Sequence, residues 1–165
     1  MKTLYLVRHA KSSWDDPSLK DYDRPLNKRG KKDAPKMGKH LKMIGVSPDL
    51  ILTSPAKRAK TTAKYIAEKI EYPLEKIIEE KEIYHADVSE LLDVIKDIDD
   101  ANNTIVMVGH NPGFTDLANY LTTTRIDNIP TTGIFCVEFD VNSWEKIHKE
   151  SGEFKLFDYP KKIRK

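Results

Sequence analysis

The chain has 165 residues, 39% hydrophobic and 33% charged, which predicts one domain over residues 1–165 with a single core and a well-solvated surface. Its 28 Lys and Arg against 26 Asp and Glu give a formal net charge of +2, so the charge balance offers no argument for nucleic-acid binding. No apolar stretch approaches the ~20 residues of a membrane span, which argues against a membrane protein.

Short apolar runs alternate with helix-like segments along most of the chain. This alternation is typical of a three-layer α/β/α sandwich around a mostly parallel central sheet. The C-terminal part instead holds two apolar runs joined by a polar segment around Trp144, which predicts an antiparallel strand there. The predicted strands are 3–8, 49–53, 75–79, 104–109, 133–140 and 153–159, and the predicted helices are 27–44, 54–70, 87–98 and one that follows Pro112.

Capping residues locate the helix ends. Asn27 is a suitable N-cap for the first helix, and Pro35 inside that helix predicts a kink or a late start. Ser54 and Pro55 suit the N-cap and the first helical position of the second helix. Residues 87–90 form a variant capping box, which predicts the start of the third helix.

Charged and imidazole side chains follow three of the predicted strands. Arg8 and His9 end the first, Arg58 follows the second, and His110 and Asn111 come directly after the fourth. Ligands of open parallel sheets bind at the carboxyl ends of the strands. A helix N-terminus attracts anions, and the planar fork of arginine fits phosphate oxygens. The arrangement therefore predicts a tetrahedral dianion held by two guanidinium groups and two imidazoles.

Four motifs, in chain order, resemble those of the histidine phosphatase superfamily, and they cover the chain from about 3 to 140. Leu6-Val7-Arg8-His9-Ala10 is similar to the Arg-His-Gly signature, with Ala in place of Gly. Arg24-Pro25-Leu26-Asn27, followed by Gly30, resembles an Arg-Pro-Leu-Thr stretch, residues 53–61 resemble the second phosphate-binding motif, and residues 109–112 resemble the motif of the second histidine. The resemblance implies a phosphoglycerate mutase-like fold.

The resemblance also implies roles for these residues. His9 would be the nucleophile that takes the phosphoryl group and forms a phosphohistidine. Arg8, Arg58 and His110 would bind the phosphoryl oxygens and stabilise the transition state, with Asn111 as a further phosphate ligand. No metal ion or other cofactor is expected, because the protein's own cations would neutralise the developing charge.

Larger relatives also use a carboxylic acid to protonate the leaving oxygen, and Glu82 is the positional candidate here. The glycine pattern that usually follows this acid is missing, so a solvated loop glutamate is the alternative interpretation. His85, three residues after Glu82, is a further candidate for a side chain that faces the site. Asp15 stands where many relatives have an asparagine that touches phosphate, and its carboxylate would repel phosphate unless Lys11 or an arginine intervenes.

Only 51 residues separate Arg58 from His110, which leaves little room for the helical cap of larger relatives. The limited room for a cap, the short chain and the uncertain acid together resemble the SixA-type branch of the superfamily, the protein phosphohistidine phosphatases. A phosphoramidate leaving group needs less help from an acid than an alkoxide does. We therefore expect a phosphatase that acts on phosphohistidine of a protein; a broad small-molecule phosphomonoesterase and a non-catalytic phosphate-binding module are the alternatives.

Other residues bear on metal binding, disulfide bonds, cellular location and oligomeric state. No HxxxH or HxH spacing exists, and flanking arginines would oppose a cation, so a metal site is not expected. Cys136 is the only cysteine and lies in an apolar run, which predicts a buried thiol and excludes an intrachain disulfide. Met1-Lys2-Thr3 enters a strand with no signal-peptide pattern, so we expect a cytoplasmic protein. A monomer is expected because no apolar helical stripe is left over.

Overall fold

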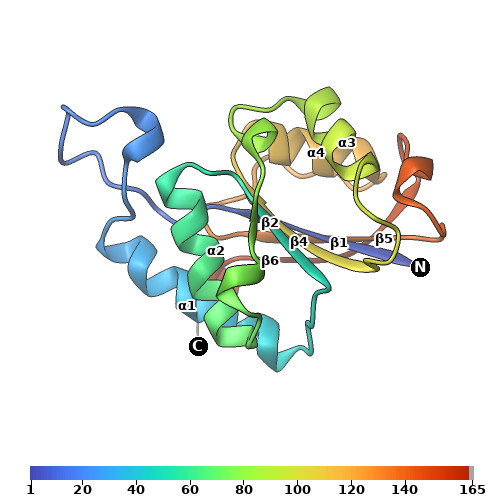
Figure 1. Cartoon of the computed structure of the whole chain (residues 1–165), viewed down its shortest axis with the longest axis horizontal. Helices are drawn as coiled ribbons and strands as arrows, with labels where there is room; N and C mark the ends of the chain where they lie inside the picture. The colour runs from blue at the N-terminus through green and yellow to red at the C-terminus, as the bar shows by residue number, and fades with distance from the viewer. Residues whose placement is uncertain (164–165) are drawn as a thin grey trace.

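The computed structural model describes residues 1–163, which form a three-layer α/β/α sandwich (Figure 1). The predicted domain extends to residue 165, and Arg164 and Lys165 lie outside the described residues. The strands are β1 (Lys2–Arg8), β2 (Leu50–Thr53), β3 (Ile78–Glu79), β4 (Thr104–Gly109), β5 (Ile134–Phe139) and β6 (Gly152–Asp158). The α-helices are α1 (Lys28–Met43), α2 (Lys57–Ile70), α3 (Val88–Lys96), α4 (Gly113–Leu121) and α5 (Pro160–Ile163).

The strands form one mixed sheet in the order β3-β2-β4-β1-β5-β6. β1, β2, β3 and β4 are mutually parallel, while β5 runs antiparallel to both β1 and β6. The carboxyl ends of β1, β2 and β4 therefore lie side by side at one edge of the sheet. The predicted fold, a mostly parallel sheet with an antiparallel C-terminal strand, is confirmed.

Helices cover both faces of the sheet, α1 and α2 on one and α3 and α4 on the other (Figure 1). The two-residue period of β1 divides its side chains between two cores. Leu4 and Leu6 pack into the core under α3 and α4, whereas Val7 packs under α1 and α2. In the central strand β4 all side chains from Ile105 to Val108 are buried, as expected of a strand covered on both faces.

Several local predictions are confirmed. The Asn27 side chain accepts a hydrogen bond from the Gly30 N–H and caps α1. Asp87 and Glu90 form the predicted capping box at the start of α3. Cys136 is a buried free thiol, and burial raises its pKa to about 12.

Three other local predictions need correction. α1 begins at Lys28 in spite of Pro35, so the late start is wrong. The expected strand at 75–79 is shorter than predicted: residues 75 and 76 belong to a 3₁₀ turn, Leu74–Lys76, and only β3 joins the sheet. α2 begins at Lys57 with Ala56 as its N-cap, so Ser54 does not cap the helix. The Ser54 N–H instead bonds to Val108 O, which continues the sheet one residue beyond β2 and delays the helix.

The start of the 11–24 loop is fixed against the beginning of α1. Lys11 O accepts a hydrogen bond from the Asn27 N–H, and Ser13 N–H donates to Pro25 O. A Cβ on Gly30 would lie 2.1 Å from Lys11 O, so only glycine permits this close approach of the two segments. The loop that follows His9 is therefore tied to the Arg-Pro-Leu stretch.

The segment between α2 and β4 forms no separate cap. It supplies the edge strand β3 and the helix α3, which packs its buried Leu91 and Ile95 into the core. This agrees with the minimal cap expected from the sequence. Within residues 1–163, no helix combines the length and apolar character needed to cross a membrane.

Candidate active site

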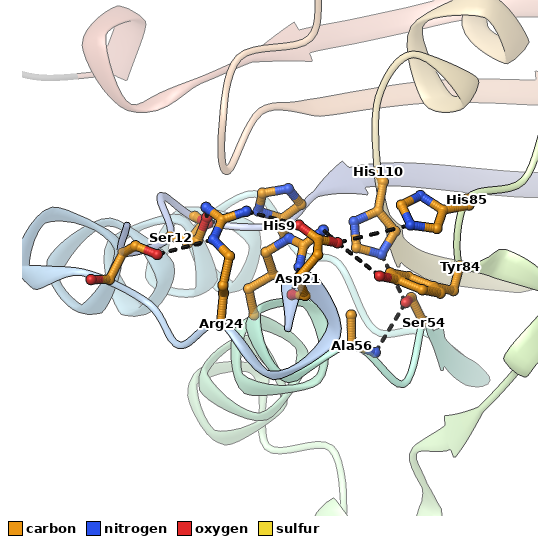
Figure 2. A network of polar contacts seen from close by, with 12 residues as sticks. His9, Ser12, Asp21, Arg24, Ser54, Ala56, Tyr84, His85 and His110 are labelled. Atoms are coloured by element: carbon orange, nitrogen blue, oxygen red, sulfur yellow. Dashed lines mark hydrogen bonds and ion pairs between the residues drawn. The ribbon is translucent and has the colours of Figure 1, made fainter. Parts of the chain in front are cut away.

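The ends of β1, β2 and β4 bring the predicted cationic and imidazole side chains together (Figure 2). The His9 N–H bonds to Gly109 O, and the rings of His9 and His110 lie 5.2 Å apart between centroids. Beside them is a cleft of about 150 Å³. Its lining residues are Arg8, His9, Lys11, Ser12, Trp14, Arg24, Arg58 and Thr131.

The site has two parts, a buried floor and a more exposed rim. The floor consists of Arg8, His9, Arg58 and His110, of which His9, Arg58 and His110 are each at most 7% exposed. The rim consists of Trp14, Asp21, Tyr84 and His85, which come from the 11–24 loop and from the segment before α3. The sequence predicted every residue of the floor, but it assigned no role to Asp21 or Tyr84 on the rim.

His9 is held as a neutral imidazole with one free nitrogen. Its Nδ1 lies 2.8 Å from Ala10 O, and since a carbonyl can only accept, Nδ1 carries the hydrogen. Nε2 therefore presents a lone pair. Burial, followed by the charges of Arg58 and Arg8, lowers the pKa of His9 to about 4 against the opposing Ala10 bond. Ala10 O is the orienting partner that the sequence alone did not reveal.

His110 presents the complementary tautomer. Its Nε2 lies 2.8 Å from Ser54 Oγ, and the same oxygen already accepts a hydrogen bond from the Ala56 N–H. A hydroxyl can accept two hydrogen bonds, but its own hydrogen needs an acceptor, and among the side-chain bonds of residues 1–163 the partner available to it is His110 Nε2. Ser54 therefore donates to Nε2, which assigns the ring hydrogen of His110 to Nδ1. Burial, and then the nearby His9 and Arg58, lower the pKa of His110 to about 3. Ser54, predicted as a helix cap, instead sets this tautomer.

The two arginines of the floor are anchored through their outer nitrogens. Arg8 Nη1 donates to Ile129 O at 3.0 Å, and Arg58 donates to Asp21 from Nη1 and Nη2 at 2.7 and 2.9 Å. Arg8 Nε, Arg58 Nε and His110 Nδ1 are buried without a partner among the described residues. Buried donors without acceptors are rare because each costs about 1–3 kcal/mol. Three such donors, together with the free Nε2 of His9, have the chemistry to bind an anion.

Asp21 ties the rim to the floor. Its Oδ2 accepts from Arg58 Nη2 at 2.9 Å and from the Tyr84 hydroxyl at 2.8 Å, and its Oδ1 accepts from Arg24 Nη1 at 3.0 Å. Burial opposes ionisation, but the hydrogen bonds from Tyr84, Arg58 and Arg24 outweigh it and hold the pKa of Asp21 well below its usual range. The carboxylate is therefore ionised at neutral pH.

Arg24 is a third guanidinium of the cleft. It is buried, donates to Ser12 Oγ and to Ser13 O, and stacks on the Trp14 ring at 3.2 Å from the centroid. The sequence had marked the Arg-Pro-Leu stretch as part of the family pattern but had assigned no role to this side chain. With Arg8 and Arg58, Arg24 is one of three arginines in the family motifs, and this could have marked its side chain as part of the site.

Glu82 does not join the site, which corrects its assignment as the acid. It is exposed and lines another cleft, of about 480 Å³, with Glu80, Glu90, Asp93, Val94 and Asp97. None of these residues lines the cleft of His9. The neighbouring Ile83 is buried in the core, and Tyr84 and His85 follow it onto the rim. Tyr84 stands edge-on to His110 at 5.5 Å, so the segment contributes a phenol rather than a carboxylic acid.

Asn111 uses its side-chain amide for contacts within the protein, and its assignment as a phosphate ligand is corrected. Its Nδ2 donates to Asn128 Oδ1 and to Ile129 O, each at 2.9 Å, while its Oδ1 accepts from Thr115. Both amide hydrogens are therefore used within the protein. Because Ile129 O is also the anchor of Arg8, Asn111 supports the position of Arg8 instead.

The other two sequence candidates lie at the edge of the site. Asp15 is exposed and is not among the residues that line the cleft. His85 has a side chain 66% exposed, stacks on Tyr84 at 3.9 Å and lies 3.9 Å from Asp21 Oδ2. Among residues 1–163, no group of three or more His, Cys, Asp or Glu side chains is placed to hold a metal ion.

Comparison with known proteins identifies the family. The sequence profile of the histidine phosphatase superfamily (branch 1) matches residues 4–93. The chain belongs to this superfamily. An uncharacterised chloroplastic protein of Arabidopsis thaliana is 33% identical over 159 residues, which are 92% of this chain and 72% of that protein.

Solved structures share the fold over nearly the whole chain. The protein histidine phosphatase SixA, solved with tungstate, has a TM-score of 0.84 at 21% identity and covers 98% of this chain and 99% of its own. A proposed phosphohistidine phosphatase SixA of Agrobacterium tumefaciens has a TM-score of 0.78 at 25% identity, with 96% and 98% covered. The family, the fold and the assignment as a phosphatase that the motifs predicted are confirmed.

Proposed function

We propose that this phosphatase hydrolyses phosphohistidine on a protein, through a covalent phosphohistidine on its own His9. One observation carries the proposal: the site combines a clamp for a phosphoryl group with the lack of an acid to protonate a leaving oxygen. Among the described residues, the carboxylate beside the floor is Asp21, which is ionised, and Glu82 lies in another cleft. Tyr84 is no substitute, because burial, followed by the Asp21 hydrogen bond, raises its pKa to about 12.

The unpartnered groups of the floor suit a phosphoryl group in number and kind. Arg8 Nε, Arg58 Nε and His110 Nδ1 would each donate a hydrogen bond to an oxygen bound to phosphorus. These donors are fixed by anchors on the protein, so they need no reorganisation as charge develops in the transition state. His9 Nε2, neutral and oriented by Ala10 O, would attack phosphorus.

The first step balances without moving any proton when the substrate is a phosphoimidazolium. The bond from His9 Nε2 to phosphorus forms while the bond from phosphorus to the substrate ring nitrogen breaks, and the electron pair stays on that nitrogen. The leaving ring keeps the hydrogen on its other nitrogen and departs as a neutral imidazole. The His9 ring takes the positive charge, and its hydrogen stays on Nδ1, which continues to donate it to Ala10 O.

Water completes the cycle. Its oxygen bonds to the phosphorus of phosphorylated His9, the bond to Nε2 breaks, and the electron pair returns to the ring. Both hydrogens of the water end on the product, dihydrogen phosphate. The same three donors would hold the oxygens in this step, because they are bound to protein and do not move with the leaving group.

Exposed aromatic side chains of the 11–24 loop support a protein substrate over a small one. Trp14 is 75% exposed and Tyr22 is 40% exposed, both on the 11–24 loop next to a cleft of only about 150 Å³. Exposed aromatic side chains are enriched at sites where protein surfaces dock. The shared fold with proteins described as phosphohistidine phosphatases adds to this support.

A direct comparison of substrates tests the proposal. The wild-type enzyme is incubated with a phosphotransfer protein carrying ³²P on histidine and, separately, with sugar and nucleotide phosphates. We expect a higher kcat/KM on the protein, and acid-labile, base-stable label on His9 during turnover. Faster hydrolysis of the small esters would instead identify a broad phosphomonoesterase. Binding of phosphate without turnover of any substrate would identify a phosphate-binding module.

A further inference from the structure

We propose that Asp21 is a specificity-determining residue, whose carboxylate accepts a hydrogen bond from the ring N–H of the substrate's phosphohistidine and so selects a cationic phosphoimidazolium over a phosphate ester. This inference rests on the proposed function and adds to it the side chain that recognises the leaving group. Asp21 belongs to a 3₁₀ turn, Asp21–Asp23, in the loop that follows the nucleophile.

The position of the carboxylate follows from the geometry of the displacement. In phosphoryl transfer the attacking and leaving atoms lie roughly in line on opposite sides of phosphorus. His9 is on the floor and 7% exposed, so the leaving group must point outwards, towards the rim. The Asp21 side chain is 39% exposed and is bonded to Arg58, which lines the cleft. Figure 2 shows it between the His9 side of the site and Tyr84.

The carboxylate still has room for one more donor. Oδ2 accepts from Arg58 and Tyr84, whereas Oδ1 accepts from Arg24. A carboxylate offers about four acceptor positions, two on each oxygen, so Oδ1 keeps one of its two. Its three partners come from separate parts of the chain and hold the group rigidly, which favours recognition of a hydrogen at a defined position.

The charge of Asp21 has opposite effects on the two classes of leaving group. A phosphoimidazolium carries positive charge and a ring N–H, and both are stabilised by an adjacent carboxylate. A phosphate ester develops negative charge on the leaving oxygen, which the same carboxylate repels. The ring loses its positive charge only as its bond to phosphorus breaks, so Asp21 stabilises the bound phosphohistidine and the part of that charge that remains in the transition state, relative to free enzyme and substrate. Asp21 therefore raises kcat/KM for phosphohistidine and lowers it for an ester at the same site.

Asp21 also orients Arg58, and the experiment must separate this positioning effect from specificity. N-phosphoimidazole and p-nitrophenyl phosphate are compared as substrates of the wild type, of Asp21→Asn and of a matched control, Asp23→Asn, in the same 3₁₀ turn. Asp23 is exposed and makes no ion pair within residues 1–163. Loss of a charge-assisted hydrogen bond predicts that the preference for N-phosphoimidazole, as a ratio of kcat/KM values, falls about tenfold or more in Asp21→Asn. The ratio of Asp23→Asn should equal that of the wild type.

Equal losses on both substrates in Asp21→Asn would overturn the inference, because a damaged Arg58 position lowers both alike. Binding of inorganic phosphate reports whether the floor is intact. If Asp21→Asn does not bind phosphate, Asp21→Glu is used in its place. Asp21→Glu keeps the charge and should therefore keep the preference for N-phosphoimidazole. Loss of that preference in a variant that still binds phosphate would overturn the inference. A wild type that prefers the ester would instead refute the proposed function.

Discussion

The floor and the rim of the site differ in how their polar groups are satisfied. On the floor, Arg8, Arg58 and His110 each keep one buried nitrogen without a hydrogen-bond partner among residues 1–163. On the rim, Asp21 has three partners and a side chain 39% exposed. The floor is thus prepared to receive an anion, whereas the rim already holds one. The floor holds the groups that would bind a phosphoryl group, and the rim holds Asp21, which would select the substrate that donates it.

Removal of the proposed nucleophile, His9, is the strongest test of the floor. We expect His9→Ala to lower turnover by about 10⁴-fold or more, because no other group can form the covalent intermediate. Inorganic phosphate should still bind, since the three unpartnered donors remain. Turnover is measured in the steady state and phosphate binding by calorimetry, with the exposed His148→Ala as the matched control. Unchanged hydrolysis by His9→Ala would refute the covalent mechanism.

Arg58 joins floor and rim, so its removal should affect both. Arg58→Ala should lower kcat/KM by about 10²–10³-fold, the effect of losing one preorganised transition-state donor. It also removes two hydrogen bonds to Asp21 and so loosens the 11–24 loop. Arg29→Ala, a partly exposed arginine on α1, is the control. A loss below about threefold would mean that the clamp does not depend on this guanidinium.

Ser54 tests the tautomer assigned to His110. Ser54→Ala removes the partner of Nε2, so the ring hydrogen can occupy either nitrogen, and we expect kcat to fall about tenfold. Nitrogen-15 NMR should find the hydrogen on Nδ1 in the wild type and a mixture in the variant. A wild-type spectrum with the hydrogen on Nε2 would contradict the assignment.

Titration of the two imidazoles tests the burial of the floor. The pKa of His9 is lowered to about 4 and that of His110 to about 3, so each gains a proton only as the pH falls through those values. Between pH 5 and pH 8 neither ring should titrate by NMR, in contrast to a histidine in a solvent-exposed peptide near pH 6.5. A midpoint near 6.5 for His9 would show that the floor is open to water.

Glu82 should give the smallest effect, and it tests the corrected assignment. Because Glu82 lies in a separate acidic cleft, Glu82→Gln should leave kcat/KM on phosphohistidine and on p-nitrophenyl phosphate unchanged within the error of the assay. Both substrates are measured at the same pH. A loss of kcat/KM on p-nitrophenyl phosphate alone would show that Glu82 is the acid and that it donates a proton to the leaving oxygen.

The contrast between floor and rim also separates what could be predicted from what could not. Arg8, His9, Arg58 and His110 were predictable because each follows a strand, and parallel strands bring their carboxyl ends to one edge of a sheet. Glu82 was misplaced because sequence position did not show that Ile83 points into the core. Asn111 was misplaced because its motif did not show that Asn128 and Ile129 lie within reach.

By itself, the sequence determined the sheet, the helices that cover it, the family and the four residues of the floor. Apolar periodicity and strand-end motifs are local properties, so they can be followed along the chain. Only the tertiary structure decided the tautomers of His9 and His110, the role of Ser54 and the contacts of Asp21. Those contacts join residues 37 and 63 positions apart, Asp21 with Arg58 and with Tyr84, through loops that have no periodic pattern. Their geometry depends on the path of the folded backbone, which no short stretch of sequence specifies.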